Sequence, residues 1–155
     1  MPIDFEAICD ALALRFEPAT IGTPTGAPAM REVWPEPPKA APVVPAVLLE
    51  VQEGSLTANP GQWKHEFHID VIFLLSKRPA DPVRVETHRR KWLPYLLRAT
   101  VGQMKLGLGG ATGYTVDKAL PTGWEFVEFD VAGVTFDAIR VPYTVWVTET
   151  VTLTA

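Results

Sequence analysis

The segment KHEFHID, residues 64–70, places two of the chain's three histidines beside two carboxylates. Such side chains are common zinc ligands and common general acids and bases. The composition of this segment is typical of a β-strand, in which successive side chains point to opposite faces. We therefore expect His65 to share one face with Phe67, and His68 to share the other with Asp70, so that the two imidazoles cannot bind one metal ion. A zinc-protease motif would also need histidines four apart on a helix, whereas these are three apart.

Three other segments contain residue types that could do chemistry. The cations of THRRKW, residues 87–92, could bind a phosphate, but on a helix they spread around the axis, which favours pairing with acids of this chain or a neighbour. Cys9 lies in a helical pattern without a nucleophile motif and is interpreted as a small buried hydrophobic residue. The glycines of GLGGATG, residues 107–113, follow a helix and precede a strand, the reverse of a phosphate-binding loop. The sequence therefore predicts no catalytic residue, no metal site and no cofactor, and hence no enzyme.

Length and composition indicate a globular protein rather than a disordered one. The chain has 155 residues, of which 47% are hydrophobic and 21% are charged, which suits a single domain over residues 1–155. A formal net charge of −4 disfavours sequence-independent binding to nucleic acid. The single cysteine fits a reducing compartment, and no apolar run approaches the roughly 20 residues that span a bilayer. We expect a soluble protein without a standard export signal.

The first half of the chain predicts one helix and three strands. A helix capped by Asp4 is expected to run to about Phe16, because apolar residues recur there at three- and four-residue steps before Pro18. AMREVWP, residues 29–35, predicts a short strand, and the proline-rich segment 35–45 predicts an extended surface segment or an edge. Residues 46–54 and 62–76 predict a long hairpin around the turn GSLTANPG.

The second half predicts another helix and two more strands. Residues 83–103 have helical periodicity, and Pro94 predicts a kink or a break near Arg90, because its ring clashes with the carbonyl four residues back. The segments 123–131 and 139–154 are rich in β-branched and aromatic residues and predict strands. The economical layering is an α+β fold, with a mixed, mainly antiparallel sheet and two helices packed on one face.

The strand patterns predict apolar residues on both faces of this sheet. Trp124 and Phe126 share one face of their strand, whereas Val127, Phe129 and Val131 point to the other. Likewise, Tyr143, Val145 and Val147 oppose Trp146. A sheet covered by helices on one side should be polar on its other side unless something else covers it. A neighbouring subunit is the simplest candidate for this second cover.

Aromatic residues are enriched where proteins meet each other, so the tryptophans are candidates for such contacts. Trp92 is expected in the core. The candidate subunit-interface residues are Trp34, Trp63, Trp124, Phe126 and Trp146.

The order of elements, including PEPPKAAPVVP, the hairpin into HEFHIDVIFLLS, the helix after RPADP and the closing VPYTVWVTETV, resembles that of the tail terminator (tail completion) proteins of long-tailed bacteriophages. This resemblance implies an α+β subunit of a ring, usually a hexamer, that caps the tail tube and joins it to the head connector. Its expected partners are copies of itself, the tail tube protein and the neck protein. The expected location is the head–tail interface of a virion, with assembly in the host cytoplasm, and DNA would pass through the ring without specific binding.

Other functions remain open at this stage. Another head–tail connector or neck protein could have a similar order of elements and a similar composition. A different class is a small α+β domain that binds a ligand or acts as an enzyme, using His65 or His68 in a pocket between sheet and helices. A third is a nucleic-acid-binding module acting through THRRK.

Overall fold

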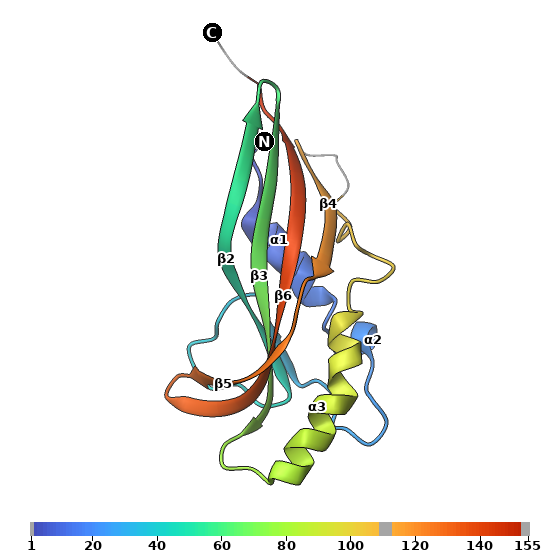
Figure 1. The fold of residues 1–155 in the computed structure, drawn as a ribbon, viewed down its shortest axis with the longest axis vertical. Helices are drawn as coiled ribbons and strands as arrows, with labels where there is room; N and C mark the ends of the chain where they lie inside the picture. The colour runs from blue at the N-terminus through green and yellow to red at the C-terminus, as the bar shows by residue number, and fades with distance from the viewer. Residues whose placement is uncertain (1, 109–112, 153–155) are drawn as a thin grey trace.

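Six β-strands form the frame of the molecule, a mixed and curled sheet in the order β1-β2-β3-β6-β4, with β5 also paired to β6 (Figure 1). The computed structural model describes residues 2–108 and 113–152. Only β1 runs parallel to its neighbour, and every other pairing is antiparallel. With its helices, the fold is therefore α+β, as predicted. The strands are β1 (Glu32–Trp34), β2 (Ala46–Asn59), β3 (Gln62–Lys77), β4 (Tyr114–Pro121), β5 (Glu125–Val131) and β6 (Val134–Thr150).

Strands β2 and β3 form the predicted hairpin, but β2 is longer than expected. The segment predicted as a turn, residues 54–61, is strand up to Asn59, and the chain reverses only at Pro60 and Gly61, whose φ is 82°. The register shifts between Val51 and Gly54, and a Cβ at Gly54 would lie 2.6 Å from the Cβ of Phe67. Glycine thus permits the close approach of two strands at this bulge.

Helices α1 (Phe5–Leu14) and α3 (Pro82–Leu97) pack on one face of the sheet, as predicted. The Asp4 carboxylate caps α1 by accepting a hydrogen bond from Ala7 N at 3.0 Å, and Asp81 caps α3 by accepting from Val83 N at 3.0 Å. The buried residues of this core include Ile8 and Leu12 of α1, Trp92 and Leu96 of α3, and the inward residues of β2, β3, β4 and β6. Trp92 is fully buried against Phe73, with ring centroids 5.0 Å apart.

The helices differ from the prediction in number and in length. A third helix, α2 (Pro18–Ile21), is a single turn in a segment predicted as loop. Helix α3 ends at Leu97 rather than Gln103, and beyond its end the Thr100 hydroxyl donates to Ala119 O of β4 at 2.8 Å. Pro94 lies in the last turn of α3 and does not break it near Arg90. Among the residues that the structure describes, no helix is long and apolar enough to cross a membrane.

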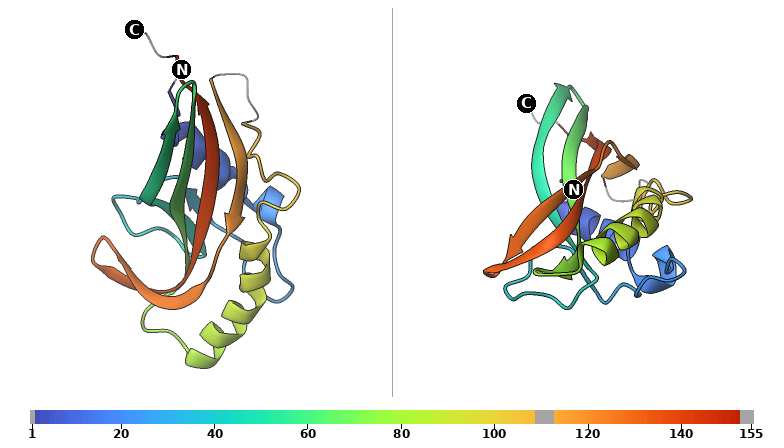
Figure 2. Two further views of the ribbon diagram at one scale, coloured as in Figure 1. Left: turned by 45° about the horizontal axis from the view of Figure 1, so that its top comes forward. Right: turned by 60° about the horizontal axis from the view of Figure 1, so that its bottom comes forward.

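The second face of the sheet is apolar at one end and polar at the other. This corrects the prediction that a neighbouring subunit is the simplest cover for its apolar residues. At one end, the β5–β6 hairpin curls out of the plane of the sheet and encloses a small second core (Figure 2). Its buried members are Ala46, Leu48, Ile72, Leu74, Val131, Phe136 and Ala138. Towards the other end this face carries Lys64, Glu66, His68 and Asp70. The second apolar surface is therefore covered by the chain's own hairpin, so it does not require a neighbouring subunit.

One strand boundary was wrong in the sequence prediction, and one strand was missed. Strand β6 begins at Val134, five residues before the predicted start, directly after the turn at Ala132 and Gly133, which have φ values of 51° and 80°. Strand β4 was not predicted. Its buried residues are Tyr114, Val116 and Ala119, and a register shift between Val116 and Lys118 interrupts the alternation by which strands are found in a sequence.

A buried tyrosine links the sheet to the end of α3 and gives a testable prediction. The hydroxyl of Tyr143 donates to Leu96 O at 2.5 Å, which satisfies one of the carbonyls that a helix leaves free at its C-terminus. Tyr143→Phe should lower the free energy of unfolding by about 1 to 2 kcal/mol, because that buried carbonyl loses its donor. Urea denaturation measures this loss. Tyr95→Phe, at a residue that is 36% exposed, is the control and should change stability far less.

Candidate functional site

The two histidines of the 64–70 segment lie on opposite faces of β3, as the alternation predicted. His65 Nε2 lies 2.9 Å from Glu149 Oε1 on the helix side, and the other oxygen of that carboxylate accepts a hydrogen bond from Ile3 N at 3.0 Å. His68 Nδ1 lies 3.0 Å from the hydroxyl of Thr144 on the outer face. His65 and Glu149 therefore hold the N-terminal segment against β3 and β6. Within residues 2–108 and 113–152, no group of three His, Cys, Asp or Glu side chains is arranged to hold a metal ion.

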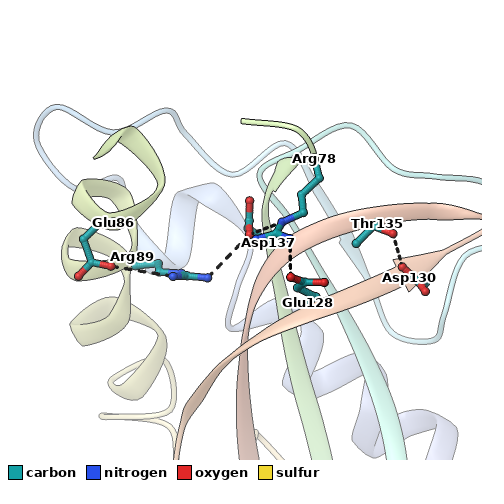
Figure 3. Close-up of polar contacts among 7 residues, drawn as sticks. All are labelled: Arg78, Glu86, Arg89, Glu128, Asp130, Thr135 and Asp137. Carbon is teal, nitrogen blue, oxygen red and sulfur yellow. Dashed lines mark hydrogen bonds and ion pairs between the residues drawn. The ribbon is translucent and has the colours of Figure 1, made fainter. Parts of the chain in front are cut away.

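A buried carboxylate organises the opposite end of the sheet (Figure 3). Asp137 of β6 is only 4% exposed, and its Oδ1 lies 2.9 Å from Arg78 Nε and 3.8 Å from an Nη of Arg89. Arg78 also pairs with Glu128 of β5, and Arg89 lies 3.9 Å from Glu86 on its own helix. This network joins α3, β5, β6 and the segment after β3. A buried charge needs such partners, so the network is structural.

Two cations of the 87–92 segment form ion pairs with acids of this chain. Arg89 reaches Asp137, and Arg90 Nε lies 2.9 Å from Glu86 Oε1, so pairing with acids of this chain is confirmed for these two. His88 faces the groove that Arg31, Lys77 and Arg84 also line. Burial lowers the pKa of His88 below its ordinary value, and the positive charges of Arg84 and Lys91 lower it further.

The remaining sequence candidates show no activated group. Cys9 is buried, and burial together with the charge of Asp10 raises the pKa of its thiol to about 11. At neutral pH this thiol is protonated and is a poor nucleophile. The glycine-rich segment 107–113 lies partly outside the described residues. The Glu125 carboxylate accepts from Arg140 at 2.6 Å, and Asp130 accepts from the hydroxyl of Thr135 at 2.5 Å, so these acids serve as local links.

The structure brings together only two of the five aromatic residues predicted at an interface. The rings of Trp124 and Phe126 lie 5.3 Å apart, and their side chains remain 51% and 38% exposed. The Arg89 guanidinium lies 4.8 Å from the centre of the Phe126 ring. Trp34 lies on β1 with 36% exposure. Trp63 and Trp146 are half-buried, and Lys118 lies over the Trp146 ring at 4.4 Å.

A groove along strand β2 was not among the sequence candidates. Strand β1 pairs only with Ala46–Leu48, so the outer edge of β2 from Leu49 to Asn59 has no strand beside it. Val51 and Leu56 are each 48% exposed there, and Phe5 of α1 is 41% exposed. Four carboxylates line the same groove, and none has an ion-pair partner within the described residues. We call this surface the acidic edge; it comprises Phe5, Glu6, Asp10, Glu36, Glu50, Val51 and Leu56.

The opposite side of the sheet carries a surface of the other charge. The segment after α3 covers the outer edge of β4, where Ala119 N donates to Met104 O at 2.8 Å and Val116 N donates to Leu108 O at 2.9 Å. Its exposed side chains include no acid, and among them Val101 is 66% and Met104 47% exposed. We call this surface the basic flank; it comprises Tyr95, Arg98, Val101, Met104 and Lys105.

The sequence held a signal for both surfaces in the distribution of its charges. Residues 1–58 contain eight acidic and three basic residues, whereas residues 87–116 contain five Lys or Arg and no acid. Such asymmetry between segments points to interaction surfaces. The net charge of the whole chain does not show this asymmetry, because the two segments have opposite charges.

Removing the charge of Asp137 should be costly for stability. Asp137→Asn leaves Arg89 and Arg78 without their shared carboxylate, and we expect the free energy of unfolding to fall by about 2 to 3 kcal/mol. Glu128→Gln removes an exposed partner of the same Arg78 and should cost less than about 1 kcal/mol. Urea denaturation of both variants gives the comparison. Equal losses would show that Asp137 is not the centre of the network.

Cys9 should resist labelling in the native protein. Its thiol pKa of about 11 leaves little thiolate at neutral pH, so a maleimide should react at least about a hundredfold more slowly than with the urea-unfolded chain. The control is Leu14→Cys in a Cys9→Ser background, because Leu14 lies on the same helix and is 61% exposed. That variant should be labelled rapidly. Rapid labelling of native Cys9 would overturn its assignment as a buried structural thiol.

The geometry thus offers surfaces suited to binding, namely an open strand edge, an exposed aromatic pair and two oppositely charged sides. Comparison with models of known protein families finds no match to this chain, and comparison with curated proteins finds no significant match either.

Proposed function

We propose that this chain is a structural virion protein, a tail-terminator-like subunit whose copies form a hexameric ring, as is usual for that family. The ring would cap the tail tube of a long-tailed phage and join it to the head connector. The observation that carries this proposal is the open edge of β2, where unpaired backbone groups lie beside exposed Val51 and Leu56. Strand edges of this kind are sites at which chains join.

Exposed apolar residues at several positions also support an assembly role. Trp124 and Phe126 form an exposed aromatic pair, and Val101 and Met104 are exposed on the basic flank. Aromatic residues and methionine are enriched in protein interfaces. The support no longer includes a second apolar face of the sheet, because the β5–β6 hairpin covers that surface.

The proposed location is the head–tail interface of the virion, after assembly in the host cytoplasm. The partners would be the tail tube protein on one side of the ring and the neck protein on the other. The formal charge of −4 per chain supports passage of DNA without retention, because an acidic ring repels phosphates. The role is mechanical, and the residues of the chain are not assigned to catalysis.

Mass measurement and imaging test this proposal together. We expect the purified chain to have a native mass several times 17.1 kDa and to appear as rings by electron microscopy. Added to open tail tubes, the rings should bind at tube ends. Binding to isolated head connectors but never to tubes would instead favour a neck protein. A chain that stays monomeric at high concentration and with tail tubes present would contradict the ring.

A further inference from the structure

Two surfaces on opposite edges of the sheet complement each other in charge and in apolar character. The acidic edge lies on β2 and α1, and the basic flank follows α3 beside β4, on the other side of the sheet (Figure 1). The acidic groove contains four carboxylates and no Lys or Arg. Arg98 and Lys105 of the basic flank have no carboxylate within ion-pair distance among the described residues. Within the described part of the chain, the carboxylates of the acidic edge therefore have no basic ion-pair partner, and Arg98 and Lys105 have no acidic one.

We infer that the acidic edge of one copy docks on the basic flank of the next copy. Phe5, Val51 and Leu56 would meet Val101 and Met104 at the apolar centre of this contact. The carboxylates would then pair with Arg98 and Lys105 around it. Such an arrangement, with an apolar centre and a polar rim, is typical of protein interfaces. The inference rests on the proposed ring and names the surfaces that would close it.

The charges determine the symmetry of this contact. Two acidic edges repel each other, as do two basic flanks, so a two-fold dimer through either surface is disfavoured. A contact between two different surfaces is head-to-tail, and it repeats until a ring closes or a filament grows. Because the two surfaces lie on opposite edges of one sheet, each copy can contact two neighbours at the same time.

This contact also determines which charges a ring would present to DNA. Arg98 and Lys105 belong to the segment 87–116, which contains five Lys or Arg and no acid. Docked on the acidic edge, these side chains are neutralised at the interface and do not line the pore. Docking therefore agrees with passage of DNA without retention, as proposed above.

Paired charge reversals test the inference. Glu6→Lys/Asp10→Lys/Glu36→Lys reverses the acidic edge, with Glu50 as its one remaining acid, and Arg98→Glu/Lys105→Glu reverses the basic flank; all five substituted residues are exposed. Each variant alone should self-associate about a hundredfold more weakly than the unchanged protein, because every contact then juxtaposes like charges. Glu66→Lys and Lys64→Glu reverse exposed charges on the outer face and should leave the native mass unchanged. Circular dichroism and melting temperature confirm that each variant folds.

Mixing the two reversed variants gives the decisive measurement. Each variant's reversed surface then meets its complement on the other variant, so the mixture should assemble into particles with equal numbers of both chains in strict alternation. Native mass spectrometry measures that ratio. Variants that both keep the unchanged protein's mass, a mixture that stays monomeric, or an unchanged chain that never self-associates would each overturn the inference.

The inference and the proposed function can fail separately. An unchanged chain that forms rings which cap tail tubes, while the charge reversals have no effect, would retain the function and place the contact elsewhere. Rings that respond to the reversals as expected but bind neither tail tubes nor head connectors would retain the contact and reject the terminator role.

Discussion

The architecture depends on one strand, β6, whose 17 residues pair with three others. It pairs with β3 from Phe136 to Thr150, with β4 over its distal half, and with β5 over its first residues. Its inward side chains, among them Val141 and Val145, supply much of the core under the helices. A strand that exchanges partners along its length must twist and bend. That bend lets the β5–β6 hairpin leave the sheet plane and enclose the second core.

Buried polar residues fix the two ends of this sheet in the same manner. At one end Glu149 accepts from Ile3 N and pairs with His65; at the other, Asp137 pairs with Arg78 and Arg89. Each is a carboxylate of β6 that reaches an element distant in sequence. Because an unpaired charge inside the protein is strongly unfavourable, each pairing selects one position for the element it holds. The residues that first suggested chemistry thus contribute to the geometry of the fold.

Regular alternation made the long strands and the opposite orientations of His65 and His68 predictable, and the helical period of residues 83–103 made the burial of Trp92 predictable. Strand β4 was not predicted from the sequence. Its bulge places the next inward residue after Val116 at Ala119, which interrupts the two-residue alternation that indicates a strand. The curl of the β5–β6 hairpin depends on contacts with distant strands, so local patterns could not reveal it. The acidic edge was missed for a similar reason, because Asp10, Glu36 and Glu50 meet only after folding.

The bulge between Val51 and Gly54 has a consequence for solubility. An exposed strand of this length would ordinarily template the stacking of further strands and lead to aggregation. Here the bulge divides the edge into two short stretches, and the backbone donors and acceptors of one stretch are not in register with those of the other. A foreign strand could match only one stretch at a time, which weakens indefinite growth. We therefore expect the open edge of β2 to remain available for binding without favouring the growth of stacked strands.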